Sequence, residues 1–195
     1  MALAACSAQA DAPGPVHPPQ AIRIVAEPIP IDPADPKAGR IGDFAYAGGL
    51  QLTSPDTSLL GGLSDLKIVG GDELVSQSDE GNLLRAHIRL DPAGRLAGLE
   101  RASIAPLTGL RGAPLQGKVE SDAEGVAVWP NGYLMVSFER NHRIWLYRHG
   151  GGDPVALPKP DVSMPDNEGM EALALAPSQG PDAYWVGIEG GSIWL

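Results

Sequence analysis

The sequence predicts an all-β fold, and within that class a β-propeller, from its composition, an internal repeat and the turn signals inside each repeat. In 195 residues there are 25 Gly and 19 Pro, whereas aromatic residues make up only 5%. This balance favours many short strands joined by tight turns over long helices. Apolar residues make up 43% of the chain, which is enough for a packed core.

The repeat consists of three segments, each with a short apolar strand, a turn and a second strand that ends in an acidic residue. Ser64, Glu124 and Glu171 occupy equivalent places in the first strand, and Asp79, Glu139 and Glu189 end the second. The paired strands cover residues 61–68 with 73–79, 122–129 with 133–139, and 169–175 with 183–189. A third strand is predicted in each unit, at residues 83–88, 143–147 and 192–195.

The spacing of these units predicts propeller blades. Position 64 to 124 is 60 residues and 124 to 171 is 47, so the first unit carries an insertion. Periods of about 40–50 residues with several strands per unit are typical of propellers, which close with about 4–8 blades. We therefore expect the N-terminal portion of a propeller, about three four-stranded blades plus a partial one, truncated at the C-terminus and spanning residues 21–195.

The first 20 residues predict a lipobox remnant and a flexible linker. Cys6, the only cysteine, closes the tetrapeptide Leu3-Ala4-Ala5-Cys6, which resembles a bacterial lipidation site. The alternative is a chance run of small residues, because only five residues precede Cys6. We therefore expect the protein in the bacterial cell envelope, on the periplasmic side. It would be lipid-anchored if Cys6 is lipidated, and secreted otherwise. After the linker, residues 22–25 predict a first strand, and four prolines between 28 and 36 exclude a helix there.

Charge and hydropathy exclude two classes of partner. The formal net charge is −10, and no run of Lys and Arg is present, so we expect no nucleic-acid binding. No stretch of about 18 apolar residues occurs, so contact with a membrane is expected only through a lipid anchor. The sequence does not identify a protein partner.

The second unit is the clearest hairpin, and it allows two registers. A two-residue turn at Asn131-Gly132 sets Glu124 opposite Glu139, whereas a three-residue loop sets Trp129 opposite Tyr133. The sequence favours the loop, because Pro130 suits the first corner of a type I turn and cannot donate a ladder hydrogen bond. In that register the two glutamates leave opposite faces of the hairpin at the same end.

Acids gathered at one level of the fold indicate a cation site. We expect Glu124, Glu139, Glu171 and Glu189 to hold a metal ion, because clustered carboxylates repel one another and hard oxygen ligands suit Ca²⁺. Arg140, His142 and Arg143 follow Glu139 closely and are candidates for gripping an anionic substrate. The alternative is solvated ion pairs at strand ends. Asp122 is interpreted as a loop cap, and no catalytic nucleophile or base is assigned.

Four motifs in order resemble the bacterial phytase-like propeller family, labelled "esterase-like activity of phytase". They are Gly61-Gly62-Leu63-Ser64, the run from Asp122 to Val128, the run from Ser137 to Ile144, and the run from Glu168 to Leu175. The resemblance covers about residues 45–195 and implies a β-propeller, export, and phosphoesterase or esterase activity. The Asp-rich run of the alkaline phytases is missing, so inositol hexakisphosphate is not the expected substrate.

Three functions remain open from the sequence. The first is metal-assisted hydrolysis, with Ca²⁺, of small phosphate or carboxylate esters in the cell envelope, with a small anionic ester as substrate. The second is a non-enzymatic propeller that binds a ligand or protein. The third is a lactonase-like propeller hydrolase.

Overall fold

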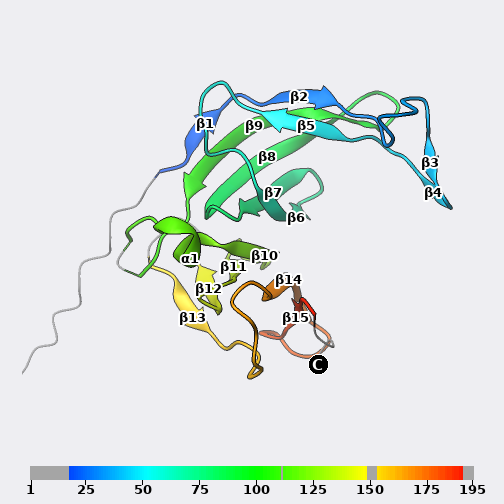
Figure 1. Ribbon diagram of the computed structural model, residues 1–195. Coiled ribbons are helices and arrows are strands. Elements are labelled where there is room, and N and C mark those ends of the chain that lie inside the picture. The colour runs from blue at the N-terminus through cyan, green and yellow to red at the C-terminus, as the bar shows by residue number, and fades with distance from the viewer. Residues whose placement is uncertain (1–17, 111, 149–152, 191–195) are drawn as a thin grey trace, which may run out of the picture.

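The computed structural model describes residues 18–110, 112–148 and 153–190, and it is an all-β structure (Figure 1). The described residues contain one short helix, α1 (Gly117–Ser121). Within them no helix is long and apolar enough to cross a bilayer. The all-β class is therefore confirmed. Cys6, the linker before residue 18 and the strand predicted at 192–195 lie outside the described residues.

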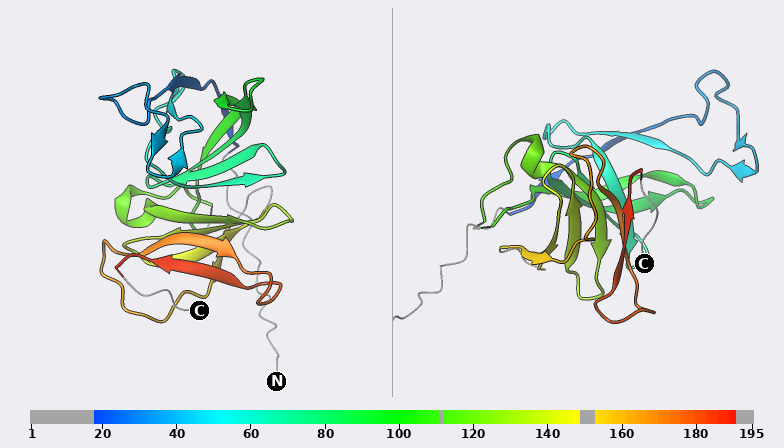
Figure 2. Two further views of the ribbon diagram at one scale, coloured as in Figure 1. Left: turned by 90° about the vertical axis from the view of Figure 1, so that its right-hand side faces the viewer. Right: turned by 60° about the horizontal axis from the view of Figure 1, so that its bottom comes forward.

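The three predicted units form three antiparallel sheets, which Figure 2 shows as successive layers. The first sheet has the order β1-β9-β8-β7-β6, the second β10-β11-β12-β13, and the third is the hairpin β14-β15. The bounds are β1 Gln20–Ile22, β6 Leu63–Val69, β7 Glu73–Ser78, β8 Asn82–Leu90, β9 Leu96–Pro106, β10 Ala123–Val128, β11 Leu134–Phe138, β12 Arg143–Tyr147, β13 Val155–Leu157, β14 Met170–Leu175 and β15 Tyr184–Ile188. The described sheets do not close into a ring, so the propeller stays a prediction.

The N-terminal part of the chain differs from the sequence prediction. Residues 22–25 are not one strand: β1 ends at Ile22, and β2 (Val25–Pro28) begins three residues later. At the break, both the backbone N–H and the guanidinium of Arg23 donate to the carboxylate of Asp56, at 2.7 and 2.6 Å. This contact turns the chain, so that β1 joins the first sheet beside β9 while β2 pairs with β5 (Leu50–Thr53).

Between β2 and β5 the chain forms a small hairpin of β3 (Arg40–Ile41) and β4 (Phe44–Ala45). In Figure 1 this hairpin projects at the right-hand side of the molecule. No helix occurs in residues 21–60, as the prolines predicted. The third strands predicted at 83–88 and 143–147 are confirmed as part of β8 and as β12.

Strand β11 contributes side chains to two hydrophobic cores, one on each of its faces, and so joins the three sheets. Alternate side chains of a strand point to opposite faces, and all five residues of β11 are buried. Val136 and Phe138 pack toward Val75 of the first sheet, whereas Met135 packs with Leu173 of the third. A strand buried on both sides is fixed in position, and so is the residue that follows it, Glu139.

The register of the second hairpin is the one with the three-residue loop. Val126 faces Val136 and Val128 faces Leu134, and the loop is closed by hydrogen bonds between Trp129 and Tyr133 and between Gly132 and Trp129, both 2.8 Å. Gly132 has φ +83°, a left-handed conformation that glycine adopts without strain. The preferred register is confirmed, and the alternative with Glu124 directly opposite Glu139 is wrong.

A β-bulge recurs at the same place in all three units, and the sequence did not reveal it. The strand register shifts around Ser64 in β6, around Glu124 and Gly125 in β10, and around Glu171 in β14. Each second strand then ends in an equivalent backbone hydrogen bond, from Asp79 to Gly62, from Glu139 to Asp122 and from Glu189 to Gly169, at 2.8–3.0 Å. A bulge inserts one unpaired residue and changes the direction of its side chain. These recurring features support the three-unit repeat independently of composition.

Candidate metal centre

Five carboxylates meet where the second and third sheets lie side by side. Asp122 precedes β10, Glu139 follows β11 and Glu189 follows β15, while Glu124 and Glu171 sit in the bulges of β10 and β14. Asp122, Glu124 and Glu139 each offer an oxygen within 4.8 Å of the others, and so do Glu139, Glu171 and Glu189. All four glutamates predicted from the sequence are therefore brought together, in two overlapping groups that share Glu139.

The bulge in β10 overturns one expectation. Glu124 and Glu139 were expected to leave opposite faces of the hairpin, but their carboxylates belong to one group. The pairs Val126–Val136 and Ala123–Phe138 differ by one step in register, so two residues, Glu124 and Gly125, lie opposite the single residue Ser137. Because a one-residue step moves a side chain to the other face, the bulge brings Glu124 toward Glu139.

Gly125 makes this bulge possible beside a neighbouring sheet. A Cβ at Gly125 would lie 2.9 Å from the backbone nitrogen of Leu173 in β14 and 2.7 Å from the Oγ of Ser137. The Ser137 hydroxyl itself accepts from the Gly125 N–H at 2.9 Å and donates to the carbonyl of Met170 at 2.7 Å. The close approach of β10 and β14 sets the distance between Glu124 and Glu171.

Crowding and burial raise the pKa values of the glutamates. Burial, followed by a hydrogen bond to Asp122 and the negative charge of Glu171, raises the pKa of Glu124 to about 7. Burial first, and then the charges of Asp122 and Glu171, raise the pKa of Glu139, which is only 6% exposed. Burial and the charge of Glu189 likewise raise the pKa of Glu171. Each of these groups would be stabilised in its charged form by a nearby cation.

The first group already has cations of its own. Asp122, 1% exposed, lies 2.5 Å from Nζ of Lys118 through Oδ1 and accepts from Nε of Arg140 at 2.7 Å through Oδ2. Burial alone would raise the pKa of Asp122, but the hydrogen bonds from Lys118 and Arg140 outweigh it and hold that pKa below its ordinary value. Asp122 is therefore a charged carboxylate with a cation on each oxygen.

The second group has no such partner. Among the residues that the structure describes, Glu139, Glu171 and Glu189 make no ion pair with Lys, Arg or His. Three carboxylates that converge without an ion-pair partner repel one another, and a hard divalent ion bound between them would remove this repulsion. This acidic cluster, in which Glu139 is buried and Glu189 is exposed, could bind a metal ion, and its residues fit one.

Comparison with known families gives one match, over residues 58–193, to the model described as "Phytase-like: Esterase-like activity of phytase". The matched stretch includes all three hairpins and all five carboxylates. The chain belongs to this phytase-like family. No curated protein and no solved structure matches it. The family supports a hydrolase-like function in coarse terms.

In this phytase-like chain the two arginines predicted to bind substrate have internal contacts. Arg140 has φ +56°, unusual for a residue other than glycine, and its guanidinium is held between Asp122 and Asn167, the latter at 2.6 Å. Arg143 stacks on the rings of Phe138 and Trp145, with 3.9 and 4.3 Å from Cζ to the ring centroids. The backbone carbonyl of Glu120 accepts from its guanidinium. Their roles toward a substrate stay predictions.

His142, the third predicted substrate residue, lies beside the acids. Its Nε2 is 2.9 Å from the carbonyl oxygen of Pro165. A Cβ on Gly169 would lie 2.9 Å from Cγ of Glu139 and 3.0 Å from Cε1 of His142, so both side chains pack directly on this glycine. Of the three residues, His142 is the one shown in contact with the same backbone segment as Glu139.

Sequence reasoning missed Lys118 and gave Asp122 a different role. Lys118 precedes Asp122 by four residues across α1, a spacing that places two helical side chains on the same face. That i,i+4 pattern of opposite charges was a usable signal. However, nothing in the sequence showed that Lys118 also reaches Asp79, the residue that follows β7.

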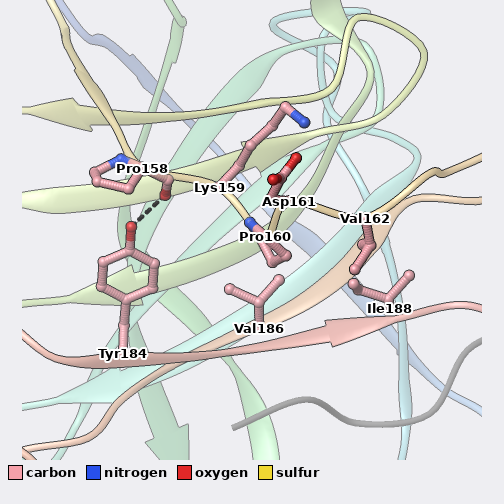
Figure 3. Close-up of a pocket in the computed structure, with 8 residues that line it drawn as sticks. All are labelled: Pro158, Lys159, Pro160, Asp161, Val162, Tyr184, Val186 and Ile188. Carbon is pink, nitrogen blue, oxygen red and sulfur yellow. Dashed lines mark hydrogen bonds between the residues drawn. The ribbon is translucent and has the colours of Figure 1, made fainter.

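A separate cavity of about 410 Å³ lies against β15 (Figure 3). The chain segment around Lys159 and the side chains of Tyr184, Val186 and Ile188 line it, and the Tyr184 hydroxyl donates to the carbonyl of Pro158. None of the five carboxylates lines this cavity. Its walls are mostly apolar, so we place the candidate chemistry at the acids.

Proposed function

We propose that this protein is a metal-assisted hydrolase of small phosphate or carboxylate esters. Ca²⁺ is the first candidate ion, and Glu139, Glu171 and Glu189 are its ligands, with Glu124 alongside. The observation that carries the proposal is the convergence of these three carboxylates, within 4.8 Å, without an ion-pair partner among the described residues. The family match supports the hydrolase class.

A divalent ion at this position would supply Lewis-acid polarisation of an ester oxygen and acidify a water. The protein's own residues provide the surroundings. The pKa of Glu124 is about 7 without the ion, and a bound cation would favour its charged form, so Glu124 suits the role of a general base. Arg140 and His142 flank Glu139 and contribute polar groups for an anionic substrate.

The proposal includes a finer fold and a location. The first strands β6, β10 and β14 lie next to one another, as the inner strands of adjacent propeller blades do, which supports a β-propeller. Lipidation at Cys6 would tether the protein on the periplasmic side of the envelope, and Leu3-Ala4-Ala5-Cys6 is the support for that location.

The activity is tested by screening the purified full-length protein against a generic aryl phosphate, an aryl acyl ester and a lactone. Each substrate is measured with added Ca²⁺ and with a chelator. We expect chelator-sensitive turnover of the phosphate or the acyl ester. Turnover of the lactone alone would favour the lactonase alternative. If Ca²⁺ binds but none of the three is turned over, the enzyme proposal is wrong and a binding module remains.

The raised pKa of Glu124 predicts a pH dependence of stabilisation by Ca²⁺. Without the ion, a carboxyl whose pKa is raised by folding stabilises the folded state below its ordinary pKa and loses that contribution as the pH rises through about 7. The ion replaces the proton, so we expect Ca²⁺ to raise Tm more at about pH 8 than at about pH 5. The measurement is thermal unfolding at both pH values with and without Ca²⁺. An equal shift at the two pH values would contradict this assignment.

A further inference from the structure

We infer that the ammonium of Lys118 occupies a second cation position, next to the proposed metal centre. The repeat offers two positions for a cation, one at each junction between sheets. Because Lys118 fills one of them, the protein binds one divalent ion. This inference rests on the proposed function, because it assumes that the group Glu139, Glu171 and Glu189 is the place left for the ion.

The first support is the environment of the Lys118 ammonium. Its Nζ lies 2.7 Å from Oδ2 of Asp79, 3.3 Å from the carbonyl oxygen of Asp79 and 2.5 Å from Oδ1 of Asp122. An ammonium has three donors, and these are three oxygens from two different sheets. Carboxylate and carbonyl oxygens are also the ligands that bind hard divalent cations in proteins.

The second support is the burial of Asp122. Its carboxylate is 1% exposed, and among the described residues Lys118 is the cation on its Oδ1, whereas Arg140 donates to its Oδ2. A buried carboxylate oxygen aimed at a single cation would need a replacement if that cation were removed.

The third support is the repeat itself, which places a lysine at one junction and none at the next. Asp79 ends the second strand of the first unit as Glu139 does in the second, and the bonds from Glu139 to Asp122 and from Glu189 to Gly169 make residues 122 and 169 equivalent. The same offset of 47 positions takes residue 118 to Pro165. The junction of the first two sheets is thus closed by an ammonium. The junction of the second and third has Pro165 in place of Lys118 and Gly169 in place of Asp122, and its acids have no ion-pair partner among the described residues.

The test counts bound ions in the full-length protein. Ca²⁺ stoichiometry is measured by titration calorimetry and by metal content after dialysis, for the wild type, for Lys118→Met, and for Lys118→Gln in case the methionine variant does not fold. Lys37→Met, at an exposed position near the β3–β4 hairpin, is the matched control. We expect one ion per chain in the wild type and in the control, and two in each folded Lys118 variant.

The outcomes separate this inference from the proposed function. One ion in the wild type and still one in both Lys118 variants would overturn the inference and leave the metal centre intact. Two ions in the wild type would also overturn it. No ion in the wild type but one in a Lys118 variant would contradict the proposed metal centre and support the role of Lys118. No ion in any protein would overturn both.

Discussion

Replacing Glu139 by glutamine is expected to weaken Ca²⁺ binding by about 100-fold or more. Among the described residues, Glu139 is the one carboxylate common to both acid groups, and it is 6% exposed, so its charge lies at the buried end of the proposed centre. Even changes to groups that merely hydrogen-bond a metal ligand cost about 10–100-fold in affinity, and here the ligand charge itself is lost. Calorimetric titration with Ca²⁺ measures the effect.

This variant should fold, which makes its loss of binding interpretable. Because burial and neighbouring charges raise the pKa of Glu139, a neutral amide of the same shape removes repulsion in the absence of metal. We expect the metal-free variant to have a Tm equal to or above that of the wild type. Glu27→Gln, an exposed change in β2, is the matched control with unchanged affinity. Unaltered Ca²⁺ affinity in Glu139→Gln would remove Glu139 from the centre.

Phe138→Ala should destabilise the protein by about 3–5 kcal/mol, the usual range for emptying a buried aromatic site. Phe138 is fully buried, its ring lies edge-on to Trp145 with 5.4 Å between centroids, and the Arg143 guanidinium stacks on it. Removing it opens a cavity between the first and second sheets, and Arg143, whose side chain is 12% exposed, loses one of the two rings on which it stacks. The free energy of unfolding in urea is the measurement.

The matched control for this change is Phe44→Ala, on β4, where the side chain is 80% exposed. Substitutions at such positions usually stay within about 0.5 kcal/mol. A loss of similar size in both variants would show that Phe138 is not a core residue. Since Phe138 directly precedes Glu139, the Phe138 variant should also weaken Ca²⁺ binding.

Local patterns predicted much of this structure because the signals that carry it are local. Pro130-Asn131-Gly132 predicted the register of the second hairpin, because a proline cannot donate a hydrogen bond and a glycine adopts positive φ without strain. The acids ending the second strands were recognised because the repeat places them alike, and Glu139 and Glu189 do join one group. The all-β class followed from the same turn-rich composition.

What the sequence did not predict depends on contacts between elements. The bulge at Glu124 and Gly125 becomes visible only when β10 is paired with β11. The prediction that Glu124 and Glu139 leave opposite faces of the hairpin was therefore wrong. The neutralisation of Asp122 by Lys118 and Arg140 needs α1, β10 and β11 to be in place. Arg143 was predicted only as a candidate to bind an anionic substrate, and its stacking on the rings of Phe138 and Trp145 became visible only in the packed structure.

The most direct test is to locate the ion itself. Crystals of the full-length protein soaked in Ca²⁺, and in Mn²⁺ for its stronger anomalous signal, would show bound metal as anomalous difference density. We predict one peak bounded by the carboxylates of Glu139, Glu171 and Glu189, with Lys118 still seated on Asp79 and Asp122. A well-ordered structure with those three carboxylates splayed into solvent and no peak between them would contradict the account.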